Sequence, residues 1–95
     1  MHARVNTTRV APDQIDDFAT AMKALVPRAI PQSPGLQSAL VLGERATGKV
    51  VIVSRWDSEA AGDAAEPMYE EAMRELRSFI AEPPTRVRYD VLLEI

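Results

Sequence analysis

Four side chains of this sequence have types that could take part in chemistry, namely His2, Asn6, Trp56 and Tyr69. Asn6 lies in the middle of a segment rich in β-branched residues, where asparagine is disfavoured. Because residues that break a local preference concentrate at functional sites, Asn6 could orient a ligand or molecular oxygen. The alternative is a solvated or self-satisfied asparagine on a sheet.

Trp56 is the only tryptophan, and Tyr69 lies in a segment with helical periodicity. The indole N–H of Trp56 could be a hydrogen-bond donor in a pocket wall, and the hydroxyl of Tyr69 could donate to a substrate oxygen. Both rings could equally be packing residues, Trp56 at one end of the sheet and Tyr69 in the core. Asn6, Trp56 and Tyr69 are therefore the candidate site residues.

The sequence lacks the residue sets of most enzyme classes. It has no cysteine, no metal-ligand spacing, no glycine-rich phosphate loop and no Ser/His/Asp set. His2 is the only histidine and could act as a base near neutral pH, but we expect it to fray because it follows the first residue. We therefore expect no metal and no cofactor. Such a chain is either an enzyme whose substrate supplies the electrons or a module that only binds a ligand.

The hydrophobic pattern predicts a single domain over residues 1–95 with the element order β-α-β-β-α-β. Strands are predicted over residues 2–10, 36–42, 50–56 and 86–95. The first helix opens at Pro12 and should kink or end at Pro27, and the second runs from Glu59, restarts at Pro67 and stops at Pro83-Pro84. Right-handed crossovers place both helices on one face of an antiparallel sheet with strand order 4-1-3-2. This is a ferredoxin-like split β-α-β fold of the α+β class.

The opposite face of this sheet is predicted to be apolar and uncovered. The run Val50-Val51-Ile52-Val53 implies burial on both sides of its strand, and Val91-Leu92-Leu93 is apolar on both sides as well. An uncovered apolar face of this kind marks an interface, and covering several hundred Å² would contribute on the order of 10 kcal/mol before the costs of association. We therefore expect a homodimer built sheet against sheet, with the C-terminal strand reaching across.

Charge and composition limit the classes of partner that the protein is expected to bind. The net charge is −3 with acids and bases interspersed, so we expect no nucleic-acid binding, which needs a clustered positive field. No apolar run is long enough to cross a bilayer, so we expect no membrane partner. With no cysteine and no signal peptide, a cytoplasmic location is expected.

Four short segments carry a family resemblance: the first strand with Asn6, Pro34-Gly35-Leu36, the third-strand ending Val53-Ser54-Arg55-Trp56-Asp57-Ser58, and Tyr89-Asp90-Val91. Over nearly its full length the chain resembles the antibiotic-biosynthesis-monooxygenase-like family of the dimeric α+β barrel superfamily. The Trp-Asp-Ser ending is the most specific of these segments.

The resemblance implies a monooxygenase that uses neither metal nor flavin and acts on an aromatic or polyketide-type small molecule. In such enzymes the substrate anion reduces oxygen directly, while Asn and Trp side chains hold the substrate, which points to Asn6 and Trp56 here, with Tyr69 as a donor. Haem-degrading relatives carry a helix-borne His, and no His stands around Glu66–Tyr69, so haem degradation is the weaker interpretation. Other relatives have no known activity, which leaves open a non-catalytic, ligand-binding or stress-related dimeric module.

Overall fold

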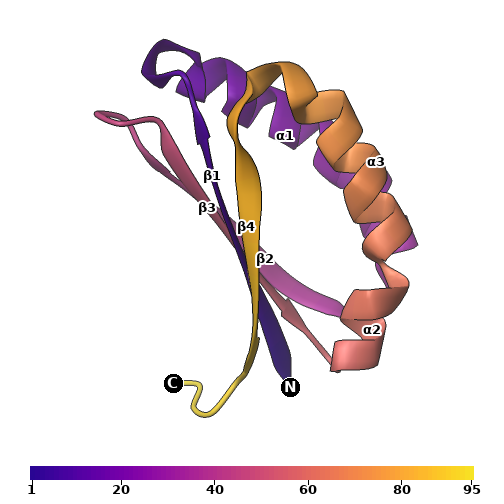
Figure 1. Ribbon diagram of the computed structural model, residues 1–95. Helices are drawn as coiled ribbons and strands as arrows, with labels where there is room; N and C mark the ends of the chain where they lie inside the picture. Colours follow the sequence, from indigo (N-terminus) through magenta and orange to yellow (C-terminus); the bar gives the residue numbers. More distant parts are fainter.

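The computed structural model describes residues 1–95 as one four-stranded antiparallel sheet with helices on one of its faces (Figure 1). The elements are β1 (His2–Val10), α1 (Ile15–Ala29), β2 (Leu36–Glu44), β3 (Lys49–Trp56), α2 (Glu59–Ala64), α3 (Glu66–Leu76) and β4 (Ile80–Asp90). The strand order is β2-β3-β1-β4, which is the predicted order. The predicted ferredoxin-like α+β fold is confirmed.

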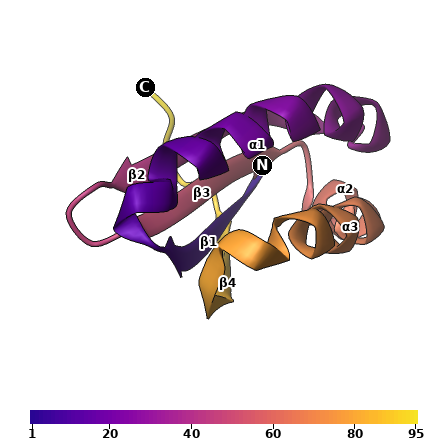
Figure 2. The same cartoon turned by 90° about the horizontal axis from the view of Figure 1, so that it is seen from above.

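The two long helices lie side by side over the sheet. Seen from above, α1 runs along the side of β2 and β3, whereas α3 runs along the other side (Figure 2). The helix α2 begins where Ser58 caps it, because the Ser58 Oγ accepts a hydrogen bond of 3.1 Å from the backbone N–H of Ala61. This cap turns the chain directly after β3 and sets α2 and α3 over the polar end of the sheet.

Of the two outcomes predicted for Pro27, a kink or an end of the first helix, the end is wrong, because α1 continues through Pro27 to Ala29. A proline inside a helix lacks the N–H that would bond the carbonyl four residues earlier. At Pro27 this loss falls in the last turn of the helix, so it affects the Lys23 carbonyl and little beyond it. The cost is therefore small enough for packing to override.

The predicted boundary between the second helix and the last strand is also wrong. The helix α3 ends at Leu76, and a short 3₁₀ turn leads into β4, which contains Pro83-Pro84 and ends at Asp90, so residues 91–95 lie outside the strand. The prolines are tolerated because β4 is an edge strand that pairs only with β1. The register between β1 and β4 shifts at Arg9, close to these prolines, which accommodates the missing donors.

The buried apolar core lies at one end of the sheet, where β1 ends and α1 begins. It contains Val10, Ile15, Phe18, Val50 and Leu76. The Phe18 ring meets that of Phe79 edge to face, with centroids 5.9 Å apart, an arrangement that aromatic pairs favour. Because this core is confined to one end, the opposite end of the helical layer needs other contacts to hold it.

The sheet face turned away from the helices, called the open face below, carries an apolar row across its full width. The strand register aligns Leu40, Val53, Val5 and Val87 from four neighbouring strands. Leu40 and Val87 are 60% and 40% exposed, and no helix covers them (Figure 1). The predicted apolar, uncovered face is therefore present. None of the helices has the length and apolar character needed to span a membrane.

Candidate functional site

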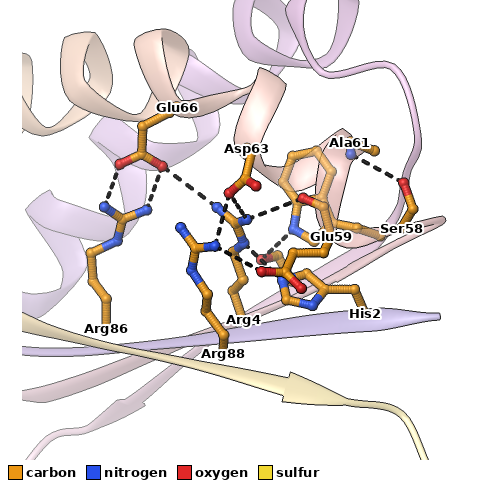
Figure 3. Close-up of polar contacts among 11 residues, drawn as sticks. His2, Arg4, Ser58, Glu59, Ala61, Asp63, Glu66, Arg86 and Arg88 are labelled. Atoms are coloured by element: carbon orange, nitrogen blue, oxygen red, sulfur yellow. Dashed lines mark hydrogen bonds and ion pairs between the residues drawn. The ribbon is translucent and has the colours of Figure 1, made fainter.

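The helix side of the sheet carries three polar rows at the end away from the core. Reading across β3, β1 and β4, the rows are Trp56–His2–Asp90, then Ser54–Arg4–Arg88, then Ile52–Asn6–Arg86. Helix α2 and the start of α3 lie above these rows (Figure 3). Adjacent residues of a row face the same side because cross-strand partners in an antiparallel sheet do so.

Arg4 is the centre of this region, although only 5% of it is exposed. Its guanidinium contacts Asp63 Oδ1 at 2.7 Å and Glu66 Oε2 at 3.5 Å, and it donates to the carbonyl oxygen of Glu59 at 3.4 Å. Its Nε donates to His2 Nε2 at 3.0 Å. A buried arginine needs such partners because it keeps its charge at any physiological pH.

Two more arginines from β4 meet the same carboxylates (Figure 3). Arg86 bonds both oxygens of Glu66, at 2.5 and 2.8 Å. Arg88 lies 3.2 Å from Glu59 and 2.9 Å from Asp63. We call this set the arginine–carboxylate cluster; its members are Arg4, Arg86, Arg88, Glu59, Asp63 and Glu66.

The cluster follows from the spacing of its residues. Glu59, Asp63 and Glu66 are four and three positions apart along α2 and α3, so they can share one helical face. Arg4 and Arg88 are direct cross-strand partners, and two like charges in that position destabilise a sheet unless opposite charges lie between them. The carboxylates supply those charges, so the cluster fixes α2 and the start of α3 to the sheet.

These contacts change the acidities of the group. The hydrogen bond from Arg86 holds the pKa of Glu66 below its usual value, and that from Arg4 lowers the pKa of Asp63 in the same way. The Glu66 carboxylate in turn raises the pKa of Arg86. The carboxyl groups of Glu66 and Asp63 are therefore ionised near neutral pH.

The prediction that His2 frays is wrong, because His2 is only 4% exposed and accepts the hydrogen bond from Arg4. The imidazole accepts through the lone pair of Nε2, so His2 is one of the acceptors of the buried Arg4 side chain. The antiparallel pairing of β1 with both β3 and β4 begins at His2 and holds the start of the chain in place.

Trp56 is buried at the end of β3 beside His2, and its indole N–H donates to Ser54 Oγ at 3.0 Å. Its row lies four residues along the strands from the row of Asn6, which is about 13 Å of backbone. The row of Arg4 lies between the two. The structure therefore does not bring Trp56 directly against Asn6.

Asn6 and Tyr69, by contrast, are connected through Arg86. Asn6 is the cross-strand partner of Arg86, and the Arg86 guanidinium lies 3.9 Å from the centre of the Tyr69 ring. Burial is the main reason that the pKa of Tyr69 is raised. The Oδ1 atom of Asn6 is buried and has no hydrogen-bond partner in the chain. We call these three residues the Asn6–Arg86–Tyr69 group.

Arg4 and Arg86 were not among the site residues predicted from the sequence. The available signal was the strand alternation, since Arg4 and Asn6 share one face of the first strand and Arg86 and Arg88 share one face of the last. Arginine on a strand is usually solvated, and only the pairing register shows that these residues meet beneath the helices.

Two pockets lie beside the helical layer. One, with a volume of about 410 Å³, lies between α3 and β4 and is called the α3–β4 groove; it is lined by Tyr69, Glu70, Met73, Arg74, Arg77, Ile80, Pro84 and Arg86. The other, of about 360 Å³, lies between α1 and α3 near the ion pair of Arg28 with Glu75. Neither is lined by Asn6 or Trp56. No three His, Asp or Glu side chains come together in a way that could hold a metal ion.

Comparison with known protein families shows to which family the chain belongs. The profile of the family described as antibiotic biosynthesis monooxygenase matches residues 1–74. The chain belongs to this family. The match covers β1 to most of α3 and includes Asn6, Trp56 and Tyr69, and the resemblance stated above is thereby confirmed.

Solved structures of other proteins have the same fold. A monooxygenase from the gene ActVA-Orf6 of Streptomyces coelicolor, in complex with the ligand nanaomycin D, is 25% identical, with a TM-score of 0.81 over 99% of this chain and 89% of that one. A Nitrosomonas europaea protein that bears the family name is 19% identical, with a TM-score of 0.80 over 98% and 100%. Rv0793 from Mycobacterium tuberculosis is 18% identical, with a TM-score of 0.76 over 98% and 96%. No curated protein matches the sequence.

The close approach of Gly62 to Arg4 gives a first test. A Cβ at Gly62 would lie 2.7 Å from three guanidinium atoms of Arg4, which is buried and bonded to Asp63 and His2. In an ordinary helix Gly→Ala stabilises by about 1 kcal/mol. Here we expect Gly62→Ala to lower the free energy of unfolding by about 1–2 kcal/mol, as measured by urea denaturation.

The control for that test is the same substitution in an Arg4→Ala background. Without the guanidinium the added methyl group meets no obstacle, so Gly62→Ala should be neutral or stabilising there. An equal effect in both backgrounds would show that Arg4 is not the cause.

The lowered pKa values of Glu66 and Asp63 predict how stability depends on pH. A carboxyl whose pKa is lowered by folding stabilises the protein above its unfolded pKa, about 4.3 for Glu, and this contribution is lost as the pH falls through the folded value. We expect the melting temperature to be constant from pH 7 to about 5 and to fall below that.

Glu66→Gln should have a lower melting temperature at pH 7 and a smaller decrease upon acidification, because the charge that titrates is absent. Glu71→Gln removes the same charge from the same helix, at a residue that forms no ion pair, and should behave like the wild type. A Glu66→Gln curve parallel to the wild-type curve would mean that the cluster contributes nothing to acid sensitivity.

Proposed function

We propose that the protein is a cofactor-independent monooxygenase that acts on an aromatic or polyketide-type small molecule and works as a homodimer. Membership of the antibiotic biosynthesis monooxygenase family supports the reaction class. The Streptomyces coelicolor relative, which was solved with nanaomycin D bound, supports a small-molecule substrate. Within this chain, the observation that carries the proposal is the buried, unpartnered Oδ1 of Asn6.

An acceptor buried without a partner costs about 1–3 kcal/mol, and a ligand that donates to it removes that cost. A phenol or enol hydroxyl is such a donor. Bound there, the substrate would lie beside Arg86 and within reach of the Tyr69 ring, which provide a flat cationic surface and an aromatic one. The site therefore suits a flat aromatic molecule with hydroxyl groups.

In the proposed reaction the substrate supplies the electrons. An activated ring CH₂ group loses a proton to solvent water to give a carbanion, which transfers electrons to O₂ and forms a C–O bond with it. A proton from water then neutralises the resulting peroxide anion. Loss of the second oxygen atom as water leaves a carbonyl group, so that CH₂ and O₂ become C=O and H₂O. Asn6 would hold the substrate and the oxygenated intermediate, and Tyr69 would donate a hydrogen bond to the oxygen that becomes negative.

We assign Trp56 a different contribution from the donor role that the sequence suggested. Because its N–H bonds Ser54, Trp56 offers a substrate its ring and not a free donor. Its burial next to His2 makes it a rigid wall at the end of the polar rows.

A second candidate function is ligand binding without catalysis. It is favoured by the pairing of the titratable groups over the polar rows: His2 bonds Arg4, and the three arginines bond the three carboxylates. Burial raises the pKa of Tyr69, which lies against Arg86, so its hydroxyl is a poor base near neutral pH. Binding of a substrate analogue without oxygen consumption would favour this alternative.

The homodimer is supported by the apolar row on the open face. Leu40 and Leu42 of β2, with Val87 and Tyr89 of β4, are between 40% and 60% exposed, and together with Val5, Val51 and Val53 they make a continuous apolar surface. A two-fold axis would cover the same surface on both chains. The exposed Leu92, Leu93 and Ile95 beyond β4 would extend the contact to the partner.

Oxygen consumption with an anthrone substrate tests the reaction. Asn6→Ala should lower kcat/KM by about 10- to 100-fold, because it removes a group that holds the reacting oxygen. The melting temperature should stay the same or rise, since Oδ1 has no partner to lose in the folded chain.

Thr7→Ala is the matched control, because Thr7 lies on the same strand but on the open face, and the rate should be unchanged. If the Asn6→Ala variant consumes oxygen at the wild-type rate, Asn6 has no role in the mechanism. A wild-type protein that consumes no oxygen would remove the reaction itself.

Sedimentation tests the dimer. The wild type should sediment as a dimer at micromolar concentration, whereas Leu40→Lys should give a folded single chain, because a charge would be buried in the interface. Val41→Lys changes a similarly exposed residue on the helix side of the same strand and should remain dimeric. A wild type that remains a stable single chain at these concentrations would refute sheet-to-sheet assembly.

A further inference from the structure

We propose that the α3–β4 groove is a binding site for a monocarboxylate with an apolar, ring-containing body. Asn6 does not line the groove, whereas Tyr69 and Arg86, the other two members of the Asn6–Arg86–Tyr69 group, do. The inference concerns binding alone and does not depend on whether the protein oxidises a substrate.

Two arginines that line the groove form no ion pair with a carboxylate. The chain has nine arginines, and seven of them form an ion pair with a carboxylate: Arg4, Arg9, Arg28, Arg45, Arg55, Arg86 and Arg88. The two that form none are Arg74 and Arg77, and both line this groove. The protein has 14 Asp and Glu residues, so a shortage of carboxylates does not explain why these two arginines are unpaired.

Arg74 forms no ion pair although the carboxylate of Glu70 is close to it in the sequence. Glu70 stands four residues before Arg74 on the same helix, a spacing at which Glu and Arg often pair, and it also lines the groove. The two side chains nevertheless form no ion pair. Arg74 and Arg77 are therefore free to bond an anion from outside the chain, and their guanidinium groups match the two oxygens of a carboxylate.

The charge balance of the groove indicates a single negative charge on the ligand. Arg86 and Glu66 neutralise each other through two hydrogen bonds, and Glu70 offsets one of the two free arginines. One positive charge remains. A dianion such as a phosphate ester would exceed it, whereas a carboxylate compensates for it.

The apolar lining of the groove indicates the nature of the uncharged part of the ligand. Met73, Ile80 and Pro84 form one part of the wall, and the Tyr69 ring, held against Arg86 at 3.9 Å, forms another. A volume of about 410 Å³ falls in the range of small-molecule sites, and it accommodates a two-ring molecule. A purely polar anion would leave these walls without contact, so the site favours an amphipathic one.

The position of the groove keeps it accessible. It is formed by α3 and by the helix-side residues of β4, at the edge of the layer seen in Figure 2. The open face lies on the other side of the sheet (Figure 1). A dimer formed through the open face would leave the groove in contact with solvent.

The test uses 2-naphthoate as the probe and methyl 2-naphthoate as its uncharged counterpart, with affinity measured by titration calorimetry on the full chain. The acid should bind more tightly than the ester, and backbone amide NMR shifts should concentrate in residues 69–86. In the double variant Arg74→Gln/Arg77→Gln the affinity for the acid should fall by about 10-fold or more, whereas that for the ester should not change.

The matched control is Arg9→Gln/Arg45→Gln, which removes the same charge from two exposed arginines outside the groove. It should bind the acid as the wild type does. The proposal is overturned if the ester binds as well as the acid, if both double variants weaken binding equally, or if the shifts centre on Asn6 or the open face. Absence of naphthoate binding at millimolar concentration overturns it as well.

Discussion

The burial of one arginine dictates much of this structure. Arg4 carries a permanent charge beneath the helices, and a charge removed from water must be compensated by well-placed acceptors. Asp63, Glu66, the Glu59 carbonyl and His2 provide them. The same requirement explains the glycine at position 62, because a side chain there would occupy the space of the guanidinium.

The molecule consequently has two unlike ends joined by one sheet. At one end α1 and the end of α3 are held by apolar packing around Phe18 and Leu76. At the other, α2 and the start of α3 are held by ion pairs (Figure 3). The row of Asn6 lies between them, next to the row of Arg4 on one side and that of Thr8 and Val50 on the other. A ligand at Asn6 would touch polar and apolar surroundings at once, as a hydroxylated aromatic molecule requires.

The sequence was sufficient for the topology and the open face, because both follow from patterns within single elements. The alternation of the strands and the run from Val50 to Val53 are local signals. The arginine–carboxylate cluster could not be predicted, since it depends on the register that aligns Arg4 with Arg88 and Asn6 with Arg86. The position of Asn6 and Tyr69 next to the same residue, Arg86, could not be predicted either, because it depends on the same register. The start of β4 was misplaced because a proline pair ordinarily ends an element, and only its place at the sheet edge makes it acceptable.

The proline pair in β4 has a further consequence for how the protein behaves at high concentration. A sheet edge with free N–H groups is a template on which foreign strands can add, and this is a common route to fibrils. Because neighbouring residues of a strand direct their N–H groups to opposite sides, the pair Pro83-Pro84 removes one of those donors from the outer edge of β4. Growth of the sheet by strand addition is thereby opposed along this border, which favours finite assemblies over open-ended polymers.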